Sequence, residues 1–240
     1  MGGRAVIVLG IETSTPQTSV AIGTETEILA ATRLTGRARQ DFVVPALDHL
    51  LRWSGLEISA VGGVAVGLGP GLFTGLRVGV EAGKSLAQVL GVPILGIPSL
   101  DALAFGVRHT SRLIGAVIDA RRGEVFYAFY RAVPGGVLRE GEYQVAPPDH
   151  LAADLEAKGE DVLLAGNGAI LYRHELRRAG GRLEFASAVS AHPQAESLVE
   201  LAVPRFHREE FDRLFDVVPL YLRKSDAEIA WDQRRRGASS

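Results

Sequence analysis

The sequence of 240 residues predicts an α/β fold that is built from two copies of one structural unit. In the first copy, an apolar run over 6–11 leads through a polar turn into a second strand over 19–23. The same order returns at 113–118 and 125–130, again with an acidic residue at the turn. Apolar runs of this length between turn residues are typical of buried strands. Their recurrence indicates a duplicated architecture.

The remaining elements follow from periodicity and from the positions of glycine and proline. Gly55 and Gly91 end helices, and Gly69 to Gly71, with a central proline, forms a tight turn between a buried strand and a helix. In the first copy we expect strands over 28–34, 61–67 and 92–97, and helices over 42–54, 73–90 and 100–107. In the second copy we expect strands over 137–145 and 161–165, and helices over 148–158 and 166–178. A helix over 194–205 and a strand over 217–222 complete the prediction.

The repeat divides the chain into two predicted domains of similar length. The boundary falls near 109–112, which gives a first domain over 1–110 and a second over 111–225. The last segment, 226–240, holds three consecutive arginines and is predicted to be a flexible basic tail.

Composition excludes several classes of protein. The chain is 47% hydrophobic and 22% charged, which is ordinary for a globular protein with a substantial core. Its formal net charge of −2 gives no global positive field of the kind that nucleic-acid-binding proteins use. The absence of cysteine excludes disulfides, thiolate nucleophiles and cysteine-based metal sites. The uncharged stretch 58–76 is broken by glycines and a proline, so we expect a soluble protein without membrane association. The absence of cysteine fits a reducing compartment, so we expect a cytoplasmic location.

The motifs of common enzyme mechanisms are missing. No two of the six histidines lie within one or two helical turns of each other, so no HxxH or HExxH metal motif is present. Neither a GxSxG elbow nor a phosphate-binding GxxxxGK[ST] loop occurs. The sequence therefore predicts no catalytic residue and no metal-binding residue.

Two acids occupy equivalent turns of the two copies, Glu12 and Asp119. In a duplicated fold they could face each other across a cleft and hold Mg²⁺ or a phosphate-bound water, or each could cap its own turn. The backbone at Gly69 and Gly71 could cradle a phosphate, although glycine at such a turn is commonly a geometric requirement. Arg121 could bind an anion or neutralise Asp119.

Two helices of the first copy carry more apolar surface than one sheet needs. On helix 42–54 the apolar arc spans roughly 180°, whereas a helix that covers one core needs about 100°. Helix 73–90 has small residues at every fourth position, at Gly75, Gly79 and Gly83. Such a stripe lets another backbone approach closely. It could pack on the helix's own sheet or on a partner helix, and the sequence favours neither.

The segment 67–80, Gly-Leu-Gly-Pro-Gly-Leu-Phe-Thr-Gly-Leu-Arg-Val-Gly-Val, resembles the signature of the TsaB (YeaZ) family of bacterial tRNA threonylcarbamoyladenosine biosynthesis proteins. Supporting matches lie at 9–14 (LGIETS), 118–121 (IDAR) and 219–223 (PLYLR). The family commonly has Asp at the first turn, where this chain has Glu12. This departure counts against a working nucleotide site.

The resemblance implies an actin-like (ASKHA) fold of two duplicated ribonuclease-H-like subdomains. It implies a non-catalytic accessory subunit for the transfer of threonylcarbamoyl to the adenosine next to the anticodon in tRNAs that read ANN codons. The transfer itself would belong to the catalytic paralogue TsaD, assisted by the ATPase TsaE and by a TsaC-type synthase that supplies threonylcarbamoyl-AMP. ATP and Mg²⁺ would be used by the complex, and tRNA would be bound through it.

In that family the partner surface lies on the first two helices of the N-terminal half, which correspond here to helices 42–54 and 73–90. The resemblance therefore implies an interface with TsaD, or a homodimer of the isolated chain. Its residues would be Val43, Leu47, Leu50, Trp53, Phe73, Gly75, Leu76, Gly79, Val80 and Gly83. A vestigial nucleotide or anion site would comprise Glu12, Thr13, Gly69, Gly71, Asp119 and Arg121.

Two other functions remain open. An ATP-dependent small-molecule kinase of the same superfamily would need tight binding of Mg·ATP by the isolated chain. A glycoprotease-like hydrolase would need metal-binding or nucleophilic residues. The sequence shows no glycine-rich nucleotide signature for the first and no such residues for the second.

Overall fold

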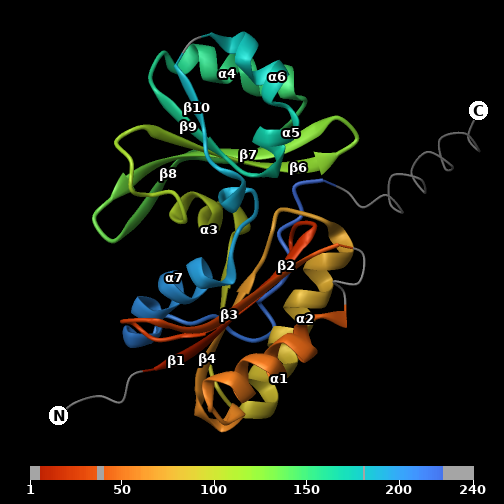
Figure 1. Ribbon diagram of the computed structural model, residues 1–240, viewed down its shortest axis with the longest axis vertical. Coiled ribbons are helices and arrows are strands. Elements are labelled where there is room, and N and C mark those ends of the chain that lie inside the picture. The colour runs from red at the N-terminus through yellow and green to blue at the C-terminus, as the bar shows by residue number, and fades with distance from the viewer. Residues whose placement is uncertain (1–5, 37–40, 181, 224–240) are drawn as a thin grey trace, which may run out of the picture.

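The computed structural model describes residues 6–36, 41–180 and 182–223. Two five-stranded sheets lie one above the other along the long axis of the molecule (Figure 1). The first sheet contains β1 (Ile7–Glu12), β2 (Gln17–Gly23), β3 (Ile28–Thr35), β4 (Val61–Gly67) and β5 (Ile94–Ile97). The second contains β6 (Leu113–Arg121), β7 (Glu124–Val133), β8 (Gly136–Ala146), β9 (Val162–Ala165) and β10 (Leu183–Phe185).

The two sheets have the same topology. The strand order is β3-β2-β1-β4-β5 in the first sheet and β8-β7-β6-β9-β10 in the second, when the second is followed from its opposite edge. In each sheet the first three strands pair antiparallel, and the last two add in parallel. The predicted duplication of one α/β unit is confirmed.

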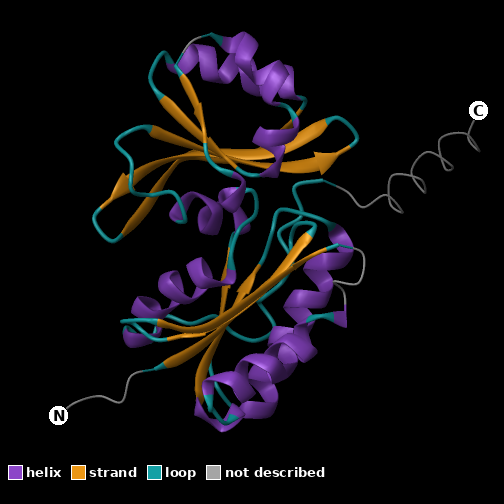
Figure 2. Ribbon diagram, viewed as in Figure 1, coloured by secondary structure: helices purple, strands orange, loops and turns teal. Residues whose placement is uncertain are grey.

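Helices lie on both faces of each sheet (Figure 2). The α-helices are α1 (Val43–Ser54), α2 (Phe73–Leu90), α3 (Ser99–Phe105), α4 (Pro148–Lys158), α5 (Asn167–Leu171), α6 (Arg173–Leu176) and α7 (Ala195–His207). Short 3₁₀ turns are η2 (Ile58–Ala60), η3 (Arg177–Ala179) and η4 (Ala188–Ser190). None of the helices in the described ranges is long and apolar enough to cross a membrane.

The predicted boundary near residue 110 separates the two sheets but not the helices that cover them. Helix α3 precedes this boundary, yet Leu100 and Leu103 pack in the core of the second sheet. Helix α7 follows it, yet Leu198 and Val199 pack on the first sheet. Each sheet needs an apolar cover on both faces, and the chain supplies part of that cover from the other half.

Several predicted elements differ in the structure. The predicted helix over 166–178 is divided into α5, α6 and η3, and β10 was not predicted. The segment 217–222 is no strand. Its Leu220 N–H donates to the Leu68 carbonyl at 2.7 Å, and Val217 fills the core beneath α1 and α2. The prediction for the tail over 226–240 lies outside the described residues.

The glycine stripe of α2 packs on the chain's own first sheet. A Cβ atom at Gly75 would overlap the Thr13 carbonyl oxygen, and one at Gly79 would overlap the Thr13 side chain. At Gly83 the overlap would be with Val66. The Thr13 hydroxyl also donates to the Gly75 carbonyl at 2.7 Å. The sequence left open whether the stripe packs on the first sheet of the same chain or on a partner helix, and the structure shows the first arrangement.

We predict that Gly79→Ala lowers the free energy of unfolding by roughly 1–3 kcal/mol, because overpacking of the buried Thr13 contact exceeds the gain in helix propensity. Urea unfolding measures this change. Ser85→Ala, on the exposed side of the same helix, is the matched control and should alter stability by less than about 0.5 kcal/mol. Equal stability of the Gly79 variant and the control would contradict the packing described here.

Candidate functional site

Glu12, at the end of β1, is fully buried. One carboxylate oxygen accepts the Ser14 N–H at 2.6 Å, and the other accepts the Ser99 hydroxyl at 2.8 Å. Ser99 Oγ in turn accepts the Gly69 N–H at 3.1 Å. A side chain at Gly67 would overlap the Glu12 carboxylate, so this close approach requires glycine. Glu12 thus joins the turn after β1, the loop after β4 and the start of α3.

Burial raises the pKa of the Glu12 carboxyl above its ordinary value of 4.5, although the hydrogen bonds from Ser14 and Ser99 oppose this shift. A carboxyl group with no exposed surface and both oxygens engaged cannot face a ligand in this conformation. Of the two arrangements that the sequence left open for Glu12, an open cleft and the capping of its own turn, the structure shows the second. The end of β4 at Gly67 lies directly against the carboxylate, which has no exposed surface.

The other residues of the predicted first-half site also serve the packing of the turn. Thr13 is buried against α2, as described above. Gly69 has a φ of +93° and lies against Leu76, which favours glycine there. A Cβ atom at Gly71 would overlap the Ser14 carbonyl oxygen. Backbone conformation and close packing therefore account for Gly69 and Gly71 without a role in phosphate binding.

Asp119, at the equivalent turn of the second sheet, caps that turn. It is 6% exposed, and Oδ1 accepts the Arg121 N–H at 2.9 Å. Its Oδ2 lies 3.4 Å from the Arg121 guanidinium, so Arg121 partly neutralises it. The Asp119 N–H donates to the Asn167 side chain at 3.1 Å, which ties β6 to the start of α5.

A C-terminal strap, defined as residues 212–223, connects the two halves near these turns. Tyr221 stacks on Phe73 with ring centroids 5.0 Å apart, and its hydroxyl accepts from Arg77 at 3.2 Å. Leu222 packs on the core of the second sheet. Arg223 pairs with Glu124 at 2.7 Å. The strap therefore holds the start of α2 and the β6–β7 turn in a fixed relation. In the sequence, the strap is signalled only by the PLYLR match at 219–223. That match overlaps the apolar run over 217–222, which predicts a strand.

The predicted interface on α1 and α2 is corrected for most of its residues. Eight of them are buried by the chain itself: Val43, Leu47, Leu50, Gly75, Leu76, Gly79, Val80 and Gly83. Phe73 is half-buried under Tyr221, and Trp53 is 80% exposed. Large apolar side chains that do reach the surface of these helices include Val44 and Val89. The periodicity identified apolar helices but not the side chains that reach the surface.

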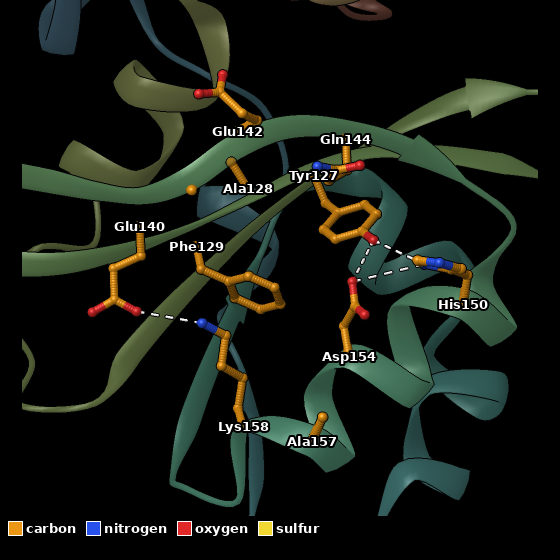
Figure 3. A pocket seen from close by; sticks show the side chains of 11 residues that line it. Tyr127, Ala128, Phe129, Glu140, Glu142, Gln144, His150, Asp154, Ala157 and Lys158 are labelled. Carbon is orange, nitrogen blue, oxygen red and sulfur yellow. Dashed lines mark hydrogen bonds and ion pairs between the residues drawn. The ribbon is translucent and has the colours of Figure 1, made fainter.

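A cavity of about 540 Å³ lies between the β7–β8 ribbon and α4 (Figure 3). The Tyr127 hydroxyl donates to Asp154 at 2.6 Å and lies 3.1 Å from His150 Nδ1. On the opposite side Lys158 pairs with Glu140 at 3.4 Å. Burial, and secondarily Asp154, raise the pKa of Tyr127, so the phenol stays protonated and acts as a hydrogen-bond donor. None of these residues is predicted from the sequence, because they come from separate elements and form no local motif.

The described residues contain no group of three histidine, aspartate or glutamate side chains that could hold a metal ion.

We predict that replacing Glu12 changes how stability depends on pH. Because the folded-state pKa lies above 4.5, the native state binds the proton more tightly, and stability falls as Glu12 ionises at higher pH. Glu12→Gln should therefore lose less stability than the wild type between about pH 5 and about pH 8 in urea unfolding. Glu57→Gln, which removes one exposed carboxylate, is the control. A pH-independent difference between wild type and Glu12→Gln would rule out this account.

Comparison with known proteins relates the chain to one family along nearly its whole length. The family model of TsaD, tRNA N6-adenosine threonylcarbamoyltransferase, matches residues 32–231. The tRNA threonylcarbamoyladenosine biosynthesis protein TsaB of Bacillus subtilis is 31% identical over 95% of this chain and 99% of its own.

Solved structures agree with this relation. YeaZ from Pseudomonas aeruginosa superposes with a TM-score of 0.78 at 30% identity, over 90% of this chain and 100% of its own. The ethanolamine utilization protein EutJ from Carboxydothermus hydrogenoformans, with a TM-score of 0.51 at 11% identity over 85% of this chain and 90% of its own, shares the fold alone. The duplicated sheets are those of an actin-like α/β fold, and the chain belongs to the TsaB (YeaZ) family.

Proposed function

We propose that this chain is an accessory subunit in the biosynthesis of threonylcarbamoyladenosine on tRNAs that read ANN codons. The observation that carries the proposal is the similarity to the tRNA threonylcarbamoyladenosine biosynthesis protein TsaB of Bacillus subtilis, over 95% of the chain and 99% of the relative. This similarity extends over both sheets, over helices α3 and α7, and over the strap, and is not confined to one part of the chain. A role in tRNA modification places the chain in the cytoplasm.

The turn geometry supports a non-catalytic role for the chain, with transfer carried out by TsaD. Glu12 is enclosed by its own loop, and Asp119 is held by the turn that it caps. A kinase or hydrolase of this superfamily would need such groups to be available to a substrate. ATP and Mg²⁺ would then be used by TsaD and TsaE, and threonylcarbamoyl-AMP would come from a TsaC-type enzyme.

An apolar sector of α2 is the surface that we propose for TsaD, or for a second copy in the isolated chain. At 100° per residue, Val78, Ala82, Leu86 and Val89 fall within about 80° of arc on the helix. Val89 is 85% exposed, and the other three are half-buried. Trp53 of α1 is 80% exposed. Helix α1 lies next to α2 and packs on the same core (Figure 1). Aromatic and aliphatic anchors of this kind dominate the energetics of interfaces.

We predict that tRNA modification by purified TsaD, TsaE and a TsaC-type enzyme requires this chain. Incorporation of labelled threonine into an ANN-reading tRNA measures the reaction, with and without the chain. The chain alone should give no product, because catalysis belongs to TsaD. Equal product without the chain would refute the accessory role and favour the kinase alternative.

We predict that Val89→Glu weakens association with TsaD by at least about tenfold, because the interface would bury an unpaired carboxylate. Size-exclusion chromatography and titration calorimetry measure the association. Leu138→Glu, at an exposed apolar position on β8, is the matched control and should leave it unchanged. The assignment of this surface would be refuted if both substitutions weakened the association with TsaD equally, or if neither substitution weakened it.

A further inference from the structure

One edge of the second sheet collects the ends of three parallel strands. β6, β9 and β10 run in the same direction, so the ends at Arg121, Ala165 and Phe185 lie on the same edge. The hydrogen bond from Asp119 to Asn167 fastens α5 to the end of β6. Figure 1 shows α5 beside β6, with α6 next to it. Residues from β6 and from α6 are thereby brought to one side of the molecule.

Two arginines, Arg173 of α6 and Arg177 of η3, are held there by stacking rather than by ion pairs. The Arg173 guanidinium lies 4.6 Å from the centroid of the Phe185 ring, and that of Arg177 lies 5.7 Å from it. Both side chains are exposed, as is Arg178. Within the described part of the chain, none of the three has a carboxylate within ion-pair distance. Stacking orients a planar guanidinium without neutralising its charge.

The β6–β7 turn brings two more arginines to this edge. Arg121 and Arg122 are exposed and adopt φ values of +63° and +56°, a left-handed conformation that such residues rarely take. Of the nearby carboxylates, Asp119 is buried and paired with Arg121, and Glu175 is half-buried. Glu124 and Glu184 are paired with arginines outside this group, Arg223 and Arg112. A chain with a net charge of −2 therefore carries a local excess of positive charge here.

We propose that this arginine edge (Arg121, Arg122, Arg173, Arg177 and Arg178) binds the phosphate backbone of tRNA. Guanidinium groups donate paired hydrogen bonds to phosphate, and several groups spread along one edge suit a chain of phosphates better than a single anion. Tyr172 and Phe185, which lie among them, offer rings for unpaired bases. The inference rests on the proposed function, which supplies tRNA as the substrate.

Fluorescence anisotropy of an ANN-reading tRNA with the full chain, at salt from about 50 to about 200 mM, tests the proposal. Arg173→Gln/Arg177→Gln should weaken binding about tenfold and reduce the slope of log K against log salt by about 1.5, since each phosphate contact contributes roughly 0.7–0.9. The control Arg208→Gln/Arg213→Gln removes two exposed arginines elsewhere and should stay within about twofold of wild type. Arg173→Lys/Arg177→Lys, which keeps the charge, should recover most of the binding.

The proposal is overturned if the wild type does not bind tRNA at low salt, if both double variants weaken binding equally, or if inorganic phosphate displaces tRNA at constant ionic strength. Circular dichroism confirms that each variant is folded. The reconstituted modification assay separates this inference from the proposed function. If Arg173→Gln/Arg177→Gln keeps both tRNA binding and full modification, the proposed accessory role is retained, but the assignment of the arginine edge as the tRNA-binding surface is refuted.

Discussion

The close approach of α2 to the end of β1 is the constraint on which the first half of the molecule depends. Three glycines allow the helix backbone to rest on Thr13 and Val66, where any side chain would collide. This contact places the Ser14 backbone and the loop after β4 around Glu12, whose carboxyl joins them to α3 through Ser99. Helix α2, the turn after β1 and the start of α3 are thus positioned by one small, buried region.

The same packing explains why equivalent turns of a duplicated fold differ in character. In the first half, the end of β4 at Gly67 and the Ser99 hydroxyl at the start of α3 lie against the acid at the turn. In the second half, the equivalent acid caps a hairpin that projects two arginines at the surface. The first half thus presents an apolar sector on α2, and the second half presents a charged edge.

The sequence was sufficient to predict the duplication, because each copy repeats apolar strands around an acidic turn within a short stretch of chain. The sequence was not sufficient to tell which element packs against the glycine stripe. Periodicity shows that one face of the helix consists of small residues, but it does not show what lies against that face. The strap was missed because the contacts of Tyr221 and Leu220 are with residues some 150 positions earlier. For the same reason the Tyr127–Asp154–His150 network left no recognisable motif. Long-range contacts of this kind depend on the tertiary fold.

The exchange of helices α3 and α7 between the two sheets makes the whole chain one cooperative unit. Leu198, Val199, Val203 and Phe206 of α7 are buried on a sheet that precedes them by more than 100 residues. Removing these four side chains from the first sheet would cost on the order of 10 kcal/mol, which is comparable with the entire stability of a typical domain. Neither half can therefore be excised as a stable fragment. A truncation that ends before α7 removes the cover of the sheet at the opposite end of the molecule.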